Sequence, residues 1–96
     1  MEKKYFIFRG IDYAGSKWMR EQLLPEHRIY VRKSGAVKMV HGGPLYDEAE
    51  EAIGSCLILE ADSSADVGKW LSAEPFFHAG LFAITSVDCW GWTYGR

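Results

Sequence analysis

The sequence lacks any long run of basic residues. Lysines and arginines occur at most in pairs, as in Lys3-Lys4 and Arg32-Lys33, and the formal net charge of the 96 residues is -2. Proteins that bind nucleic acids normally display a basic stripe that neutralises phosphates. We therefore expect no nucleic-acid partner.

Cysteine is scarce, and long apolar runs are missing. The two cysteines, Cys56 and Cys89, form no Cys-x-x-Cys motif, so the spacing typical of a redox pair or a zinc site is not present. No apolar run has the length of a transmembrane helix. The apolar segment after Met1–Lys4 is too short for a signal peptide. We expect a cytoplasmic protein with no membrane partner.

Glycine-rich phosphate-binding loops are missing too, since neither Gly-x-Gly-x-x-Gly nor a Walker motif occurs. Aromatic side chains, in contrast, make up 15% of the residues, beside ordinary contents of hydrophobic (48%) and charged (25%) residues. So many rings indicate a filled core, a pocket or an interface. The length predicts one domain over residues 1–96. Pairing with a second copy would bury apolar surface that so small a chain leaves exposed.

Apolar patterning predicts six main segments in the order strand, helix, strand, strand, helix, strand. Two strands are expected at residues 5–8, ended by Gly10, and at residues 36–41, ended by Gly42-Gly43-Pro44. Two more are expected at 55–61 and 81–89. Over 90–94 the aromatic residues alternate as they would in a strand. The expected helices are 16–33, interrupted by Pro25, and a second one that starts at Ser63 and ends before Pro75. The acidic run 47–51 is expected to be a solvated loop or a single helical turn.

This order is the split βαβ motif, so we predict an α+β, ferredoxin-like β-α-β-β-α-β fold with two helices on one face of an antiparallel sheet. The first and third expected strands are apolar without alternation, which indicates that both of their faces are covered. A second subunit is the simplest cover for the face without helices. We therefore expect a homodimer.

His27 is a candidate functional residue because of its spacing. Leu23 and Leu24 precede it by four and three residues, and Tyr30 and Val31 follow it by three and four. In a continuous helix these positions share one face, so the imidazole would point inward. A buried histidine with one hydrogen-bond partner is the plain alternative.

Glu74 has the same kind of position on the second helix. It follows Val67, Trp70 and Leu71 by seven, four and three residues, so it should point inward at the helix end. A buried carboxylate is costly unless it is paired or protonated. The plain alternative is that the helix frays before Pro75 and that the carboxylate is solvated.

The two helices of a split βαβ fold lie side by side, so His27 and Glu74 can meet. A carboxylate fixes the tautomer of an imidazole and stabilises its charged form, which makes such a pair suited to proton transfer. Gly42 and Gly43 would let a ligand approach the backbone, unless they only form a tight turn. His27, His41 and His78 also have donor atoms for a metal together with Glu74, but their spacing matches no standard site.

Three segments resemble the YCII-related proteins, in the right order over nearly the whole chain. They are Leu24-Pro25-Glu26-His27-Arg28-Ile29-Tyr30-Val31 followed by Met39-Val40-His41-Gly42-Gly43-Pro44-Leu45, then Gly54-Ser55-Cys56-Leu57-Ile58-Leu59-Glu60-Ala61, and finally Glu74-Pro75-Phe76-Phe77-His78-Ala79-Gly80-Leu81-Phe82. The resemblance implies a ferredoxin-like subunit in a dimeric α/β barrel, with a histidine and an acidic residue in a pocket. These fall on His27 and Glu74. The acidic residue of the family is usually aspartate, so Glu74 is a departure.

The resemblance also implies an activity, because one branch is similar to a dehydrochlorinase of chlorinated hydroxyquinols and the wider superfamily includes muconolactone isomerases. We therefore expect a lyase or isomerase that transfers protons without a cofactor on a small, often aromatic, molecule. His27 would be the base or acid and Glu74 its partner, with Gly42 and Gly43 bordering the substrate. Aromatic side chains would line the pocket, as is usual for small-molecule sites: Tyr5, Trp70 and Phe77. The alternative is a non-catalytic dimeric module that binds a small ligand or a protein, with a purely structural His–Glu pair.

Overall fold

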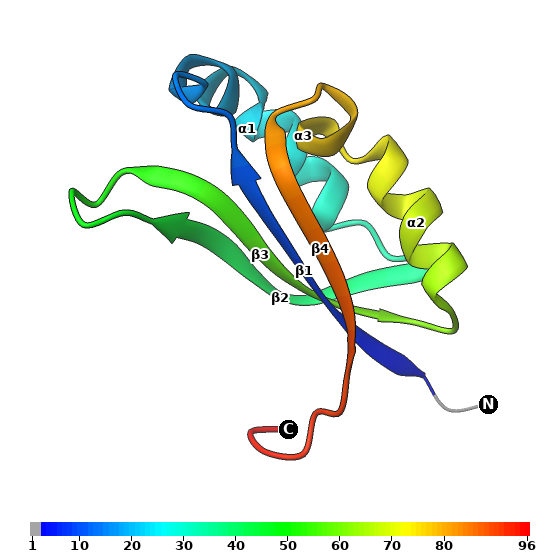
Figure 1. Cartoon of the computed structure of the whole chain (residues 1–96). Helices are drawn as coiled ribbons and strands as arrows, with labels where there is room; N and C mark the ends of the chain where they lie inside the picture. Colours follow the sequence, from blue (N-terminus) through cyan, green and yellow to red (C-terminus); the bar gives the residue numbers. More distant parts are fainter. Residues whose placement is uncertain (1–2) are drawn as a thin grey trace.

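A computed structural model describes residues 3–96, which form a sheet with helices along one side of it (Figure 1). In chain order the elements are β1 (Lys4–Asp12), α1 (Lys17–Val31), β2 (Val37–Tyr46), β3 (Ala52–Ala61), α2 (Ser64–Ala73), α3 (Pro75–His78) and β4 (Phe82–Trp90). The strands pair antiparallel in the order β2-β3-β1-β4. The predicted ferredoxin-like order is confirmed, and α3 is an additional short turn of helix.

Side chains along β1 alternate between the two faces of the sheet. Phe6 and Phe8 face the helices and are fully buried, whereas Tyr5 and Ile7 lie on the opposite face and are half-buried. The core lies between the sheet and the helices and consists of these buried side chains: Phe6, Phe8, Val37, Leu57, Leu59, Ala61, Val67 and Leu71. The opposite face of the sheet, which carries Tyr5 and Ile7, is called the open face below.

The prediction that Gly10 ends the first strand is wrong. β1 continues to Asp12, and Gly10 pairs with Ser55 on β3 and Thr85 on β4. A Cβ atom at this position would lie 2.7 Å from Cδ1 of Phe82, so a larger residue would collide with that ring. The glycine therefore serves close packing within the strand and does not break it.

The second strand is also longer than predicted. β2 runs through Gly42-Gly43-Pro44 to Tyr46, and all three residues pair with β3. Because β2 is an edge strand, a proline without an N–H group costs no ladder hydrogen bond when its nitrogen faces outward. The acidic run 47–51 forms the connecting turn to β3, as predicted.

The helix α1 is continuous from Lys17 to Val31, so the predicted interruption at Pro25 is wrong. Pro25 lacks the N–H that would bond to the carbonyl of Glu21. It lies on the exposed side, while Arg20 and Val31 are buried on the inward side and hold the helix in place. Among residues 3–96, no helix is long and apolar enough to cross a membrane.

The aromatic tail is not a strand, contrary to the prediction. β4 ends at Trp90, and residues 91–96 are irregular. Trp92 turns back so that its ring stacks on Trp90, with 5.6 Å between centroids, and meets the Tyr5 ring edge-on at 5.2 Å. The tail therefore covers part of the open face, while Tyr94 remains exposed.

Candidate active site

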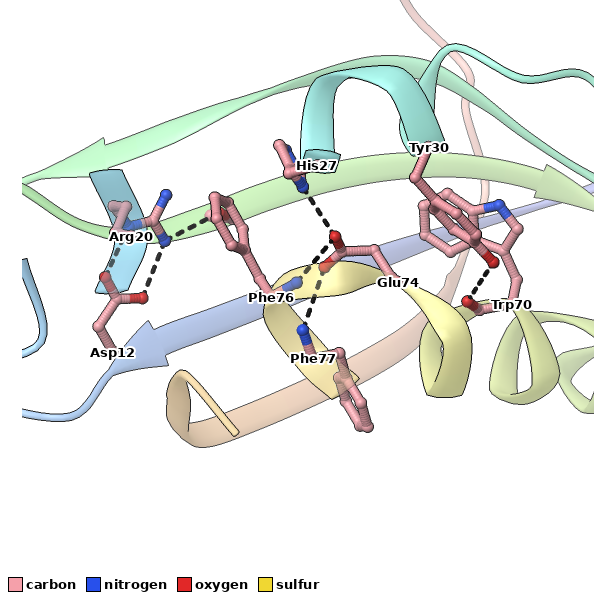
Figure 2. Close-up of polar contacts among 9 residues, drawn as sticks. Asp12, Arg20, His27, Tyr30, Trp70, Glu74, Phe76 and Phe77 are labelled. Atoms are coloured by element: carbon pink, nitrogen blue, oxygen red, sulfur yellow. Dashed lines mark hydrogen bonds and ion pairs between the residues drawn. The ribbon is translucent and has the colours of Figure 1, made fainter. Parts of the chain in front are cut away.

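The structure brings the side chains of His27 and Glu74 together. His27 lies on the inward face of α1, and Glu74 lies between α2 and α3 (Figure 2). Nδ1 of His27 and Oε2 of Glu74 are 2.9 Å apart. The Glu74 side chain is 1% exposed and that of His27 is 12% exposed, so the ring sits at the boundary between the interior and solvent.

Glu74 is buried for a reason that the helical spacing did not predict. Its backbone is extended, with φ -69° and ψ 129°, so it ends α2 and at the same time caps α3. Its carboxylate accepts hydrogen bonds from the backbone N–H groups of Phe76 at 3.1 Å and Phe77 at 3.3 Å. Pro75 occupies the first helical position, where a missing N–H is harmless. These two amides and the imidazole compensate for the desolvation of the carboxylate.

The contact determines which ring nitrogen of His27 is available. A carboxylate can only accept, so Nδ1 carries the proton toward Glu74, and Nε2 of the neutral ring is left as an acceptor. The imidazole stacks on the Phe76 ring with 4.1 Å between centroids and 13° between planes. Phe76 is fully buried and thereby fixes the orientation of the imidazole. A histidine held in this way can accept or return a proton at Nε2.

A pocket of about 380 Å³ lies against His27, between α1 and the β2–β3 part of the sheet. This volume suits a small ring-sized molecule. His27, Gly42 and Gly43 all line it. A Cβ atom on Gly42 would lie 2.6 Å from Sδ of Met39 and 2.9 Å from Cδ2 of Leu57, whereas Gly43 has open space beside it. Gly42 therefore leaves room for the side chains of Met39 and Leu57, which line the pocket.

Sequence reasoning missed a second polar cluster in the same pocket. Arg20 is buried and donates from Nε and Nη2 to the carboxylate of Asp12, at 2.6 and 2.8 Å. Nη2 also donates to Oγ of Ser55 at 3.0 Å. Arg20 precedes His27 by seven residues, so the two share a helix face. This spacing was the feature of the sequence that could have identified Arg20 as a residue on the same face as His27.

The three aromatic residues expected to line the pocket lie elsewhere. Tyr5 is on the open face, where its hydroxyl accepts a hydrogen bond from Arg96 at 3.0 Å. Trp70 borders a different hollow, near the end of α1. Phe77 packs against the core, with its ring 6.1 Å from that of Phe8. The alternation of β1 and the break between α2 and α3 direct these rings away from His27.

The three histidines are not brought together either. The ring of His41 packs edge-on against Trp92 at 5.3 Å, and His78 is exposed at the end of α3. Across residues 3–96, no group of three or more His, Cys, Asp or Glu side chains is arranged to hold a metal ion.

Tyr30 connects α1 to α2 beside the His–Glu pair. Its hydroxyl donates to the carbonyl oxygen of Trp70 at 2.7 Å (Figure 2). Burial raises the pKa of the Tyr30 hydroxyl above 10.0, and the nearby Glu74 charge raises it further. The hydroxyl is therefore a stable hydrogen-bond donor at neutral pH.

Comparisons with known proteins identify the family and the fold of this chain. The sequence model of the YCII-related domain matches residues 7–91. A solved structure of 5-chloro-2-hydroxyhydroquinone dehydrochlorinase from Burkholderia phenoliruptrix, in complex with 2,5-dihydroxybenzoquinone, superposes with a TM-score of 0.81 and 33% identity, over 91% of this chain and 93% of that one.

A second solved structure, PA3566 from Pseudomonas aeruginosa, has a TM-score of 0.59 at 13% identity, over 94% of this chain and 93% of that one, and shares the fold alone. A search of the curated proteins finds no match. The fold is that of the dimeric α/β barrels. The family match covers most of the chain, and the chain therefore belongs to the YCII-related family.

Proposed function

We propose that the protein is a small-molecule enzyme of lyase or isomerase type in which His27 transfers a proton without a cofactor. The observation that carries the proposal is the 2.9 Å contact between His27 and the buried Glu74, at the wall of a pocket of about 380 Å³. Support also comes from the similarity to a dehydrochlorinase that acts on a chlorinated hydroxyhydroquinone.

In the proposed step, Nε2 of His27 accepts a proton from the substrate while Nδ1–H remains bonded to Glu74. The electron pair of the broken bond forms a new double bond in the substrate. In a lyase reaction a leaving group departs with its own electron pair, and in an isomerase reaction the imidazolium returns the proton at another atom. Glu74 stabilises the positive charge on the ring between these events.

The direct test is turnover by His27→Gln, which keeps the size of the side chain but removes its basicity. The substrate panel is chlorinated hydroxyhydroquinones and muconolactones, followed by chloride release and ultraviolet absorbance. We expect kcat to fall by roughly 10²–10⁴-fold, the usual contribution of a positioned base. The control is His41→Gln, because His41 packs on Trp92 on the open face. Undiminished turnover by His27→Gln contradicts the proposal.

A second candidate is a non-catalytic binding module. It is favoured by the two backbone hydrogen bonds of Glu74, which give this carboxylate a structural task that does not involve a substrate. Such a module would be stabilised by members of the panel, seen as a rise in Tm, without forming product. Product formation by the parent protein would decide against it.

We also propose that two copies pair through the open face of the sheet. In residues 3–96 the helices cover only the other face, and the open face carries Ile7 and Ile58, which are half-buried, and Ile84, which is 65% exposed. Apolar side chains on an uncovered sheet face are typical of an interface between subunits. The dimer would leave the His27 pocket, on the helix side, accessible to small molecules.

A further inference from the structure

One aromatic side chain borders the His27 pocket without a task in the fold. Tyr46 is the last residue of β2, it lines the pocket, and it is 61% exposed. The hydroxyls of Tyr5 and Tyr30 are hydrogen-bonded, whereas that of Tyr46 has no hydrogen-bond partner among residues 3–96. Its side chain therefore contributes little to the core, and its ring is available to a ligand.

The pairing of β2 with β3 shows which way Tyr46 faces. The two strands contribute three directly opposed pairs to the pocket wall: Gly42 with Leu57, Pro44 with Ser55, and Tyr46 with Ala52. Opposed residues of an antiparallel pair project to the same face of the sheet, and alternate residues along a strand share a face. The ring of Tyr46 therefore projects to the pocket side of the sheet.

A β-bulge places a small residue opposite this ring. Leu45 pairs with Gly54 and Tyr46 pairs with Ala52, so Ile53 is an extra residue in β3. A bulge of this kind redirects the side chains beside it. Without the bulge, the branched side chain of Ile53 would stand opposite Tyr46. The methyl group of Ala52 instead leaves space beside the ring.

The turn after Tyr46 is ordered and is tied to α1. Oδ1 of Asp47 accepts hydrogen bonds from the backbone N–H groups of Ala49 and Glu51, at 2.9 and 3.0 Å. Nζ of Lys17, the first residue of α1, lies 2.9 Å from Oε2 of Glu51. An exposed ion pair adds little stability. It does join the two walls of the pocket, α1 and the β2–β3 hairpin, at the end where Tyr46 lies.

The rest of the pocket offers a planar ligand no comparable surface. Among residues 3–96, Tyr46 is the only pocket-lining residue with a six-membered aromatic ring. The imidazole of His27 already stacks on Phe76. The other apolar side chains of the wall that are larger than alanine are aliphatic: Leu24, Val31, Met39, Pro44 and Leu57. A flat ring bound in the pocket therefore has one aromatic ring, that of Tyr46, to stack on.

We infer that Tyr46 is a specificity-determining residue, whose ring stacks on a planar ring bound in the His27 pocket and favours it over a puckered ring of the same size. The inference rests on the proposed function and adds to it the residue that recognises ring shape. A flat ring brings a whole face against the tyrosine ring, whereas a puckered saturated ring touches it with a few hydrogens. Stacking also removes the exposed face of Tyr46 from water.

The test uses two probes with oxygens at the same ring positions but with different ring shapes. Hydroquinone is flat and trans-cyclohexane-1,4-diol is puckered, and both are titrated against the protein by NMR at neutral pH under nitrogen. Tyr46→Leu keeps an apolar side chain but removes the aromatic ring. It should weaken hydroquinone binding by roughly 2–10-fold, the usual contribution of one aromatic pair, and change diol binding little. Tyr46→Phe should bind both probes as the parent does.

The matched control is Tyr13→Leu. Tyr13 is 57% exposed, close to the value for Tyr46, but it borders a different hollow at the start of α1. Its replacement should leave the preference for hydroquinone as it is in the parent. In the parent protein we also expect nuclear Overhauser effects between the ring protons of Tyr46 and those of hydroquinone, a readout that does not depend on the folding of any variant.

Three results would overturn the inference. The first is a parent protein that does not bind hydroquinone more tightly than the diol. The second is a Tyr46→Leu variant whose affinity falls equally for both probes or for neither. The third is the absence of nuclear Overhauser effects between Tyr46 and bound hydroquinone.

Failure of this inference is distinguishable from failure of the proposed function. On a substrate of the panel, the loss in Tyr46→Leu should appear in KM, whereas the loss in His27→Gln should appear in kcat. If His27→Gln keeps turnover while Tyr46→Leu loses the preference for hydroquinone, the role of Tyr46 stands and the proton-transfer role of His27 falls. If His27→Gln loses turnover while Tyr46→Leu keeps the preference, the function stands and the inference falls.

Discussion

The Glu74 carboxylate contacts the His27 imidazole and also caps α3, and the sequence predicted only the first of these contacts. The spacing of His27 and Glu74 on two amphipathic segments predicted that they point inward, and their side chains meet. The sequence did not predict that Glu74 also caps α3, because a cap depends on backbone angles at the Glu74-Pro75 junction. The extra methylene relative to aspartate does not prevent the contact with the imidazole.

The first prediction concerns the contribution of Glu74 to the stability of the fold. Glu74→Ala leaves the buried Phe76 amide without its acceptor and removes two further hydrogen bonds, so we expect a loss of about 3 kcal/mol in the free energy of unfolding. Ser63→Ala is the matched control: Ser63 caps α2 through one bond to the Asp66 amide, and its loss should cost about 1 kcal/mol. Urea unfolding measures both. Equal losses of unfolding free energy in the two variants would mean that Glu74 contributes no more than an ordinary N-cap residue.

The second prediction concerns pH. Burial, assisted by the Glu74 charge, raises the folded-state pKa of Tyr30 above its unfolded value of 10.0. Stability from this group is therefore fully present below pH 10 and is lost as the pH rises through the folded pKa. Tyr30→Phe should be less stable than the parent by about 1 kcal/mol at neutral pH, because it loses the bond to the Trp70 carbonyl. This difference should shrink above pH 10. A stability difference between the parent and Tyr30→Phe that stays constant above pH 10 would contradict the raised pKa of Tyr30.

Arg20 shows why part of the site was not predictable. Arginine side chains are mostly exposed, and only the spacing of seven residues from His27 indicated that Arg20 shares its helix face. Its partner Asp12 lies beyond Gly10, where the first strand was expected to end. β1 instead carries Asp12 one pleat beyond Gly10 and beneath α1. The pairing is therefore a tertiary contact that no local pattern contains.

At the scale of elements, hydrophobic periodicity predicted the order and type of the strands and helices. Apart from the aromatic tail, the errors occur at glycine and proline: Gly10, Gly42, Gly43 and Pro44 lie within strands, and Pro25 lies within a helix. Local rules treat these residues as breakers. Strand pairing and core packing override that tendency where a side chain would collide, as at Gly10, or where the strand is at an edge, as at Pro44.

The third prediction uses two adjacent glycines of β2. Gly42→Ala places a methyl group against Met39 and Leu57 on the pocket floor, so it should destabilise the fold by about 1–2 kcal/mol and weaken ligand binding. Gly43→Ala meets nothing within 4 Å and should be neutral or stabilising by a few tenths of a kcal/mol. Thermal unfolding and calorimetry of both variants test this. Similar behaviour of the two would show that the pocket floor is elsewhere.

At the scale of the whole molecule, the two faces of the sheet differ in what they carry. The helix side holds the core and the His27 pocket, and the open face carries apolar side chains that are partly covered by Trp92. The first and third strands are apolar without interruption, which predicted that the open face of the sheet is covered as well as the helix side. The tail could not be predicted, because aromatic alternation over 90–94 describes a strand and a folded-back segment equally well.

The fourth prediction tests the proposed dimer with two neighbouring residues of β4. Ile84 lies on the open face and Thr85 on the helix side, and both are exposed. Ile84→Lys should shift the protein to monomers in analytical ultracentrifugation, because a charge would be buried at the interface. Thr85→Lys should leave the dimer unchanged. A monomeric parent protein, or a dimer in Ile84→Lys, contradicts pairing through this part of the face.

The central claim is that His27 and Glu74 act as one proton-transfer unit, and a double-mutant cycle on kcat tests it most directly. The parent, Glu74→Gln, His27→Gln and the double variant are compared on the same substrate. If Glu74 acts through His27, Glu74→Gln lowers kcat in the parent background but has little further effect once His27 is replaced. If the two losses simply multiply, or if Glu74→Gln loses nothing, the pair is not the catalytic unit.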